Sequence, residues 1–175
     1  MKKYWSIIII IILFLSLSIY SHAESHKEAI KALKKLEAKI EMGVNYQKYV
    51  EVLGETNAEV KLFLESKSSK KYPDIVTSIN KIMDNYKDAA KLWSVIIDHP
   101  GRVSFFSPYD KPLPRGGYPY GYEIYSKLFT KYPKAYDKLS NYRNGFGKEI
   151  TLNDFLSVIW NEAFKETKKL SSYLD

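Results

Sequence analysis

The sequence predicts an all-α protein of about five or six helices with one long irregular loop. Apolar residues recur at three- and four-residue spacing over most of the chain, whereas only one short stretch, residues 102–106, favours a strand. No repeat survives a shift along the sequence, which argues against a solenoid. The chain has 175 residues, of which 45% are hydrophobic, and this is enough for one helical domain with its own core.

The first 23 residues are predicted to be a secretory signal peptide. A positively charged start precedes an apolar run at residues 7–17, and small residues occupy the two positions that signal peptidase recognises, ending at Ala23. Cleavage near Ala23 would export residues 24–175 as the mature chain, to the periplasm or the medium. The alternative is an uncleaved N-terminal membrane anchor, although the apolar segment is at the short limit for a bilayer span.

Residues 24–98 are predicted to form an amphipathic three-helix part. The helices are expected at residues 24–42, 46–65 and 73–98. Gly43 suits a left-handed cap that ends the first helix, and Pro73 suits the first position of the third. Gly54 is a candidate break in the second helix, and the polar residues 66–71 are expected to form a loop. The predicted buried positions of the first two helices are Ile30, Leu33, Leu36, Ile40, Tyr49, Val50, Leu53, Val60, Phe63 and Leu64.

The stretch ALKKLEAKIEMGVNYQKYVEVLGETNAEVKLFLES, with the IMDNYKDAAKLW segment after it, resembles a helical region of uncharacterised exported bacterial proteins. The resemblance covers residues 29–93 and depends on helix-forming composition. It implies a helical exported module and no particular activity. The half of the chain after residue 98 carries no such resemblance, so no functional residue follows from it.

Residues 99–121 are predicted to form an ordered, extended loop. Five of the seven prolines and four of the eight glycines fall here, and such a stretch is uncommon inside a compact domain unless it is functional or packs as an Ω-loop. Its many aromatic residues argue against simple disorder.

The C-terminal part, residues 122–175, is predicted to be helical again. Two short helices are expected at residues 122–131 and 134–142. Thr151 and Asp154 then form a capping-box-like start to a final helix.

Basic charge is concentrated in residues 99–147. This segment holds eight Lys or Arg residues against three acidic ones, and eight of the 13 tyrosines that follow residue 23. Cations interleaved with aromatic rings suit an anionic partner, or a sugar polymer on which rings can stack. For an exported protein the candidate partners are an anionic envelope polymer, lipid headgroups or an acidic protein, and nucleic acid is not expected. The candidate binding residues are Tyr109, Arg115, Tyr118, Tyr120, Tyr122, Lys127, Lys131 and Lys134.

A structural interpretation of the same segment stays open. The lysines of residues 127–138 can equally form a solvated helical face, and the tyrosines can fill gaps between helices.

The sequence contains no motif that marks a known catalytic or metal site. Cysteine is absent, and so are Walker-loop, GxGxxG, HExxH, GxSxG and EF-hand patterns, so no catalytic residue, metal ligand or cofactor is assigned. His26 is expected at a frayed terminus and His99 at a helix end, which argues against a two-histidine metal site. Trp93 and Trp160 lie on apolar stripes and are interpreted as core residues rather than ligand platforms.

The leading hypothesis is a non-enzymatic exported helical protein that contacts a partner through residues 99–147. One alternative is a hydrolase acting on envelope polymer, with Asp98, His99, Asp110 and Arg115 near its site. Another is a signal-anchored structural protein of the envelope.

Overall fold

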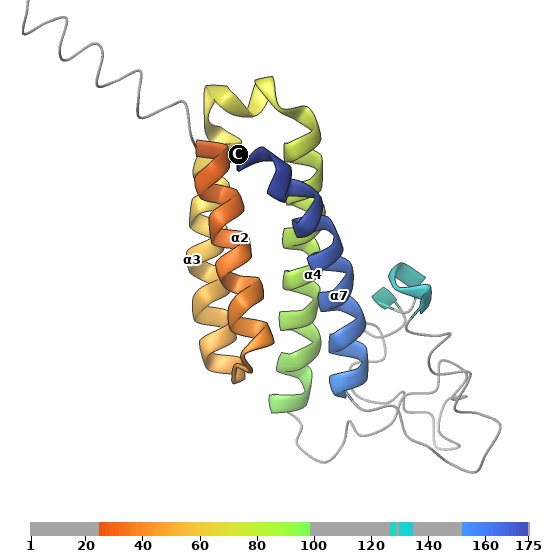
Figure 1. The fold of residues 1–175 in the computed structure, drawn as a ribbon. Helices are drawn as coiled ribbons and strands as arrows, with labels where there is room; N and C mark the ends of the chain where they lie inside the picture. Colours follow the sequence, from red (N-terminus) through yellow and green to blue (C-terminus); the bar gives the residue numbers. More distant parts are fainter. Residues whose placement is uncertain (1–24, 99–126, 129, 135–151, 175) are drawn as a thin grey trace, which may run out of the picture.

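The computed structural model describes residues 25–98, 127–128, 130–134 and 152–174, and across these ranges the protein is all-α with no strand, as predicted. Its helices lie side by side as an upright bundle (Figure 1). They are α2 (Ser25–Glu41), α3 (Tyr46–Glu65), α4 (Pro73–Asp98) and α7 (Leu152–Leu170), with 3-10 turns η1 (Lys67–Lys71) and η2 (Ser171–Tyr173). The described part thus holds four α-helices, with short helical pieces between residues 127 and 134, where the sequence predicted five or six over the whole chain.

Helix α2 follows the predicted pattern closely. Its apolar residues at positions 30, 33, 36 and 40 are all buried, because the three- and four-residue spacing places them on one face of the helix. The helix ends at Glu41. Two residues later, Gly43 has a φ of 84° and its N–H donates to the carbonyl of Ile40 at 3.0 Å. That left-handed conformation is one that glycine adopts without steric cost.

Helix α3 starts at a side-chain cap and runs without a break. The Asn45 side-chain oxygen accepts a hydrogen bond from the backbone N–H of Lys48 at 2.8 Å, which satisfies one of the free donors of the first turn. Gly54 does not interrupt the helix, contrary to the weak point suggested by the sequence. The buried face also differs from the predicted one, since Val52 is buried and Val50 is exposed.

Two further expectations for this half of the chain are wrong. Residues 66–71 were expected to be an irregular loop, but Lys67–Lys71 form the 3-10 turn η1. His26 was expected at a frayed terminus, but it is buried in the first turn of α2, with its ring centroid 4.6 Å from that of Tyr72. The stacking of His26 on Tyr72 therefore ties the start of α2 to the turn between α3 and α4.

Helices α4 and α7 complete the core. Helix α4 begins at Pro73 and ends at Asp98, as predicted. The core is one continuous cluster that receives apolar side chains from all four helices, including Leu33 of α2, Phe63 of α3, Ile79 of α4 and Ile159 of α7.

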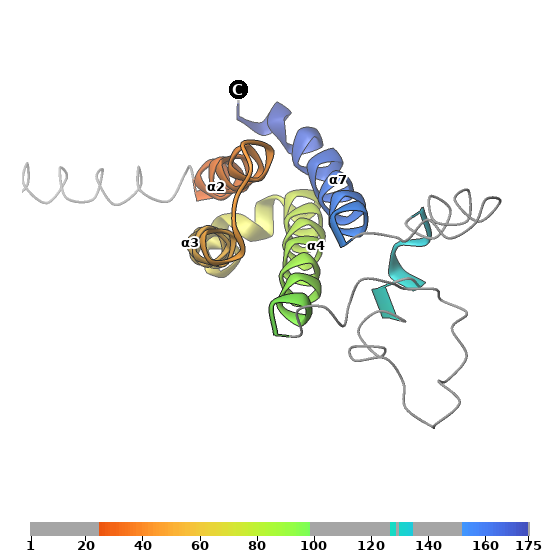
Figure 2. The ribbon, with the colours of Figure 1, turned by 90° about the horizontal axis from the view of Figure 1, so that it is seen from below.

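The four helices are not packed equally against one another. Helix α2 packs chiefly on α3, and α7 packs chiefly on α4. Figure 2, a view along the bundle, shows α2 and α7 standing apart on the side opposite the α3–α4 contact. The candidate site lies on this side of the bundle, between α2 and α7.

Several predictions fall outside the described residues. These are the signal peptide at 1–23, the loop at 99–121 with its strand signal, His99, and most of the two short helices after residue 122. In the part of the chain that the structure covers, no helix combines the length and the apolar character needed to cross a bilayer.

Candidate functional site

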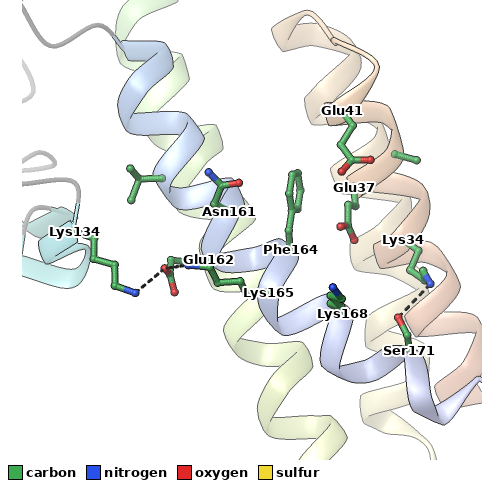
Figure 3. Close-up of a pocket in the computed structure, with 12 residues that line it drawn as sticks. Lys34, Glu37, Glu41, Lys134, Asn161, Glu162, Phe164, Lys165, Lys168 and Ser171 are labelled. Atoms are coloured by element: carbon green, nitrogen blue, oxygen red, sulfur yellow. Dashed lines mark hydrogen bonds and ion pairs between the residues drawn. The ribbon is translucent and has the colours of Figure 1, made fainter. Parts of the chain in front are cut away.

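A groove of about 840 Å³ lies between α2 and α7. Its walls carry charged side chains of both signs, with apolar side chains between them (Figure 3). The lining residues are Lys34, Glu37, Ala38, Glu41, Lys134, Val158, Asn161, Glu162, Phe164, Lys165, Lys168 and Ser171. A concave site with convergent polar groups is the usual form of a ligand-binding site in an otherwise convex bundle.

The α2 wall of the groove is acidic along its second half. Glu37 and Glu41 are one helical turn apart, and like charges at this spacing repel each other. Partial burial raises the pKa of the Glu37 carboxyl, and the neighbouring charge of Glu41 raises it further, while Lys34 opposes both effects. Within the described residues neither glutamate forms an ion pair, so both are available to a cationic group.

A buried phenol lies in the core near this wall, outside the residues that line the groove. Burial raises the pKa of the Tyr86 hydroxyl, and the nearby charge of Glu37 adds to the rise. Tyr86 therefore stays neutral and places a polar atom close to the acidic wall.

The α7 wall combines an aromatic ring with amide and ammonium groups. Phe164 lies between the two helices in Figure 3, Asn161 also lines the groove, and Lys168 lies farther along the same helix. At the η2 end, the Lys34 ammonium donates to the Ser171 hydroxyl at 3.2 Å, which is a direct contact between the two walls. Helices α2 and α7 run in opposite directions. Lys34 and Lys168 therefore lie at the η2 end of the groove, and Glu41 and Asn161 lie at its other end.

The outer rim of the groove contains one of the predicted binding residues, Lys134. Its ammonium lies 3.5 Å from a carboxylate oxygen of Glu162, which Lys165 also contacts at 2.9 Å. The hydrogen bond from Lys165 lowers the pKa of Glu162, against the effect of partial burial, and the charge of Lys134 lowers it further. Glu162 is therefore neutralised by its own neighbours, unlike Glu37 and Glu41.

Of the other predicted residues that the structure describes, Lys131 lies against α4, as does its neighbour Tyr132. Lys131 pairs with Asp88 at 2.5 Å, and the buried Tyr132 hydroxyl donates to Asn85 at 2.8 Å and lies 3.0 Å from Asp88. Lys127 is exposed. The structure thus brings Lys134 to the groove and uses Lys131 to attach the segment to the bundle. The remaining candidates, Tyr109, Arg115, Tyr118, Tyr120 and Tyr122, lie outside the described residues.

An aromatic cluster occupies the end of the bundle away from η1. Tyr46, Tyr49, Trp93 and Trp160 have neighbouring ring centroids 5.7–5.9 Å apart, which is the normal range for aromatic pairs. The Trp160 indole N–H donates to the Tyr49 hydroxyl at 3.4 Å, and that hydroxyl donates to the carbonyl of Tyr86 at 2.8 Å. Both tryptophans are half-buried and pack against the core, so the cluster fixes the relative positions of α3, α4 and α7.

Apart from Lys134, sequence reasoning did not identify the residues of the groove. The pair Glu37 and Glu41 could have indicated a cation-binding site from the sequence. Like charges one turn apart destabilise a helix unless a cationic group binds between them. The α7 residues gave no signal, because Lys165 and Lys168 look like an ordinary wet helix face. In the described ranges, no three His, Asp or Glu side chains gather in a way that could hold a metal ion.

Comparison of the chain with protein-family models, with curated proteins and with solved structures found no match.

Proposed function

We propose that this chain is an exported, non-enzymatic binding protein that holds peptide groups of the bacterial cell-wall polymer in the α2–α7 groove. The single observation that supports the proposal is the placement of unpaired charges of both signs around one apolar groove. The basic segment 99–147, which reaches the rim of the groove through Lys134, is proposed to extend the contact to the anionic parts of the polymer.

The chemistry of the wall peptides matches the two ends of the groove. Short peptides that cross-link a sugar polymer carry free carboxylates and free amines. Lys34 and Lys168 would bind a carboxylate at the η2 end, and Glu37 with Glu41 would bind an amine. Lys34 and Glu41 are seven residues apart on one helix, or about 10 Å, which is the length of a few peptide units in extended form.

The proposal predicts binding to purified cell-wall sacculi. The full 175-residue chain is expressed in a bacterial host, and the protein recovered from the envelope or medium is pelleted with sacculi at low and high salt. We expect pelleting that salt weakens, because charged contacts on an open surface are screened.

A matched pair of double variants tests the site itself. Glu41→Gln with Lys168→Gln removes one charge of each sign from the groove, and Glu59→Gln with Lys87→Gln does the same on exposed surface elsewhere. The groove variant should bind sacculi about tenfold or more weakly, since truncating charged contacts in an interface costs this much or more. The surface variant should bind as the original protein does, and equal binding by both variants would exclude the groove as the site.

The same incubation distinguishes binding from hydrolysis. A binding protein leaves the sacculi intact, so no soluble sugar–peptide fragments should appear in the supernatant over time. Release of fragments, abolished by Asp98→Ala with His99→Ala, would instead establish the hydrolase alternative.

Export with cleavage near Ala23 is part of the proposal and has its own test. The intact mass of the recovered chain should correspond to residues 24–175. A mass that includes residues 1–23 would replace secretion by N-terminal anchoring, with the groove proposal unaffected.

A further inference from the structure

The end of the bundle where α3 turns into α4 carries an exposed group of lysines. Lys67, Lys70 and Lys71 all lie in the five-residue turn η1, and all three side chains are exposed. None of them forms an ion pair with a described residue. We call these three residues the η1 lysines.

The turn that carries them is held rigidly by hydroxyl groups. The Ser25 hydroxyl lies 2.6 Å from that of Ser68, and the Ser66 hydroxyl lies 2.7 Å from Ser68 and donates to the carbonyl of Phe63 at 2.7 Å. Ser69 closes the turn by donating to the carbonyl of Ser66 at 2.8 Å. The first residue of α2 is therefore part of the same hydrogen-bonded unit as the η1 lysines.

Apolar side chains accompany the lysines at this end. Leu62, one turn before the end of α3, is 63% exposed, and Tyr173, in η2, is 39% exposed. Figure 1 shows the C-terminus, η1 and the start of α2 at the same end of the bundle. Asp74, in the first turn of α4, offsets one of these positive charges, and Glu65, at the end of α3, is paired with Lys61, so these residues together carry a net positive charge. Lysine, tyrosine and leucine on one surface are the composition of proteins that lie at a lipid–water interface.

The position of this end in the chain indicates which surface it meets. The predicted signal segment, with its apolar run at residues 7–17, lies just upstream of Ser25 in the sequence, so until cleavage near Ala23 this end of the bundle would be the one next to the membrane. The opposite end of α2, at Met42, lies about 25 Å away along the helix.

We propose that the η1 lysines form a docking surface for anionic phospholipid headgroups, with the bundle standing end-on to the membrane. The lysines pair with headgroup phosphates, while Leu62 and Tyr173 enter the interfacial layer. This surface is separate from the α2–α7 groove and does not depend on the function proposed for it.

The absence of cysteine from the chain makes a direct test simple. A single cysteine is introduced by Leu62→Cys at the η1 end or by Met42→Cys at the opposite end, where the side chain is 80% exposed. Each full-length variant is expressed, recovered and labelled with a polarity-sensitive fluorophore. The label is then followed on addition of vesicles of phosphatidylcholine alone or with 30% phosphatidylglycerol.

The proposal expects a blue shift of the label at position 62 with the anionic vesicles, a smaller one or none with neutral vesicles, and none at position 42. A triple variant, Lys67→Gln, Lys70→Gln and Lys71→Gln, should shift the titration midpoint to about hundredfold higher lipid, because each lysine near an anionic surface contributes about fivefold. A control triple, Lys39→Gln, Lys87→Gln and Lys91→Gln, removes the same charge elsewhere and should change the midpoint by less than about fivefold.

Three outcomes would overturn the proposal. They are a shift at position 42 in place of position 62, equal effects of the two triple variants, and a response that does not depend on anionic lipid. Loss of sacculus binding in the groove variant, measured separately, would leave this result unchanged, so the two proposals fail independently.

Discussion

The two faces of helix α7 differ in burial and in charge pairing. The face toward α4 buries Leu156, Ile159 and Ala163 completely or nearly so, and Glu166 closes its edge by contacting Lys81 at 2.6 Å. The face toward α2 leaves Phe164 half-buried in the groove. There Glu162 pairs with Lys165 and Lys134, but Glu37, Glu41 and Lys168 form no ion pair with a described residue. Charged side chains at the α4 face thus pair and cover the packing, whereas three charged side chains of the groove have no ion-pair partner among the described residues, and the groove is therefore the candidate site.

The largest effect is expected from Ile159→Ala, which tests the packing of the α4 face. Ile159 is fully buried between α7 and α4, and removing its three outer carbon atoms leaves a cavity, so the free energy of unfolding should fall by about 3 kcal/mol. Urea denaturation measures the change. Leu62→Ala, at an exposed position, serves as the control and should cost less than about 0.5 kcal/mol. A small effect of Ile159→Ala would mean that the α4–α7 contact is as loose as the α2–α7 side.

A second test concerns the segment that brings Lys134 to the groove. Tyr132→Phe removes the buried hydroxyl that contacts Asn85 and Asp88 and should lower the free energy of unfolding by about 1.5 kcal/mol, since it leaves buried partners unsatisfied. Burial raises the pKa of this phenol, as does the charge of Asp88, so the hydroxyl stays a donor across the physiological range. The exposed Tyr173→Phe is the matched control, and equal stability of both variants would show that residues 130–134 are not held by Tyr132.

Glu166→Gln tests the ion pair between Glu166 of α7 and Lys81 of α4, at the edge of the α4–α7 contact. Hydrogen bonds from Lys81 and Lys169 lower the pKa of Glu166, against the effect of burial, so its charged form stabilises the fold. The stabilisation is present above the ordinary carboxyl pKa of 4.5 and is lost as the pH falls through the lowered value. The variant should therefore unfold about 1 kcal/mol more easily at pH 7, and the difference should shrink in acid. A difference that is constant with pH would exclude the ionic contribution.

Glu37→Gln should have a smaller effect of the opposite sign. Because the folded protein raises the pKa of Glu37, ionisation of this group costs stability as the pH rises through the raised value. The variant should be more stable than the original protein at pH 7, by less than about 1 kcal/mol because the group is partly solvated, and equally stable below pH 4. Melting temperatures at the two pH values measure this, with Glu59→Gln as the exposed control. A loss of stability at pH 7 would mean that Glu37 has a cationic partner and that the groove is not open on this wall.

The spacing of apolar residues predicted the positions of the helices well, because a helix is formed by residues that are close together in the sequence. The buried residues of α2 and the start of α4 at Pro73 follow from spacing and backbone geometry alone. The sequence predicted Val50 rather than Val52 as a buried residue of α3 because both lie close to the apolar stripe of the helix. Which of the two is buried depends on how α3 packs against α2 and α4. The η1 turn was missed because serine and lysine carry no apolar pattern, although their hydroxyl groups make it regular.

The groove could not be predicted in the same way. It depends on α2 facing α7 and the turn η2, so that Lys34 contacts Ser171, which is 137 positions away in the sequence. It also depends on α2 and α7 being held apart by their stronger contacts with α3 and α4. Lys134 was selected for its charge within a basic segment, and the structure places it at the groove for a different reason, its contact with Glu162. Charge composition predicted an acidic partner for this part of the chain, but not that two acidic partners, Asp88 and Glu162, lie within the protein itself.

The length of α4 sets a distance between two parts of the molecule. Its 26 residues span about 39 Å, from the turn beside Ser25 to the end where Asp98 leaves the bundle and Leu152 returns to it. The chain therefore leaves the bundle after Asp98 and re-enters it at Leu152 at the end remote from Ser25. If the η1 end stands on a membrane, the bundle is a spacer, and its height determines how far the tyrosine-rich segment begins above the lipid.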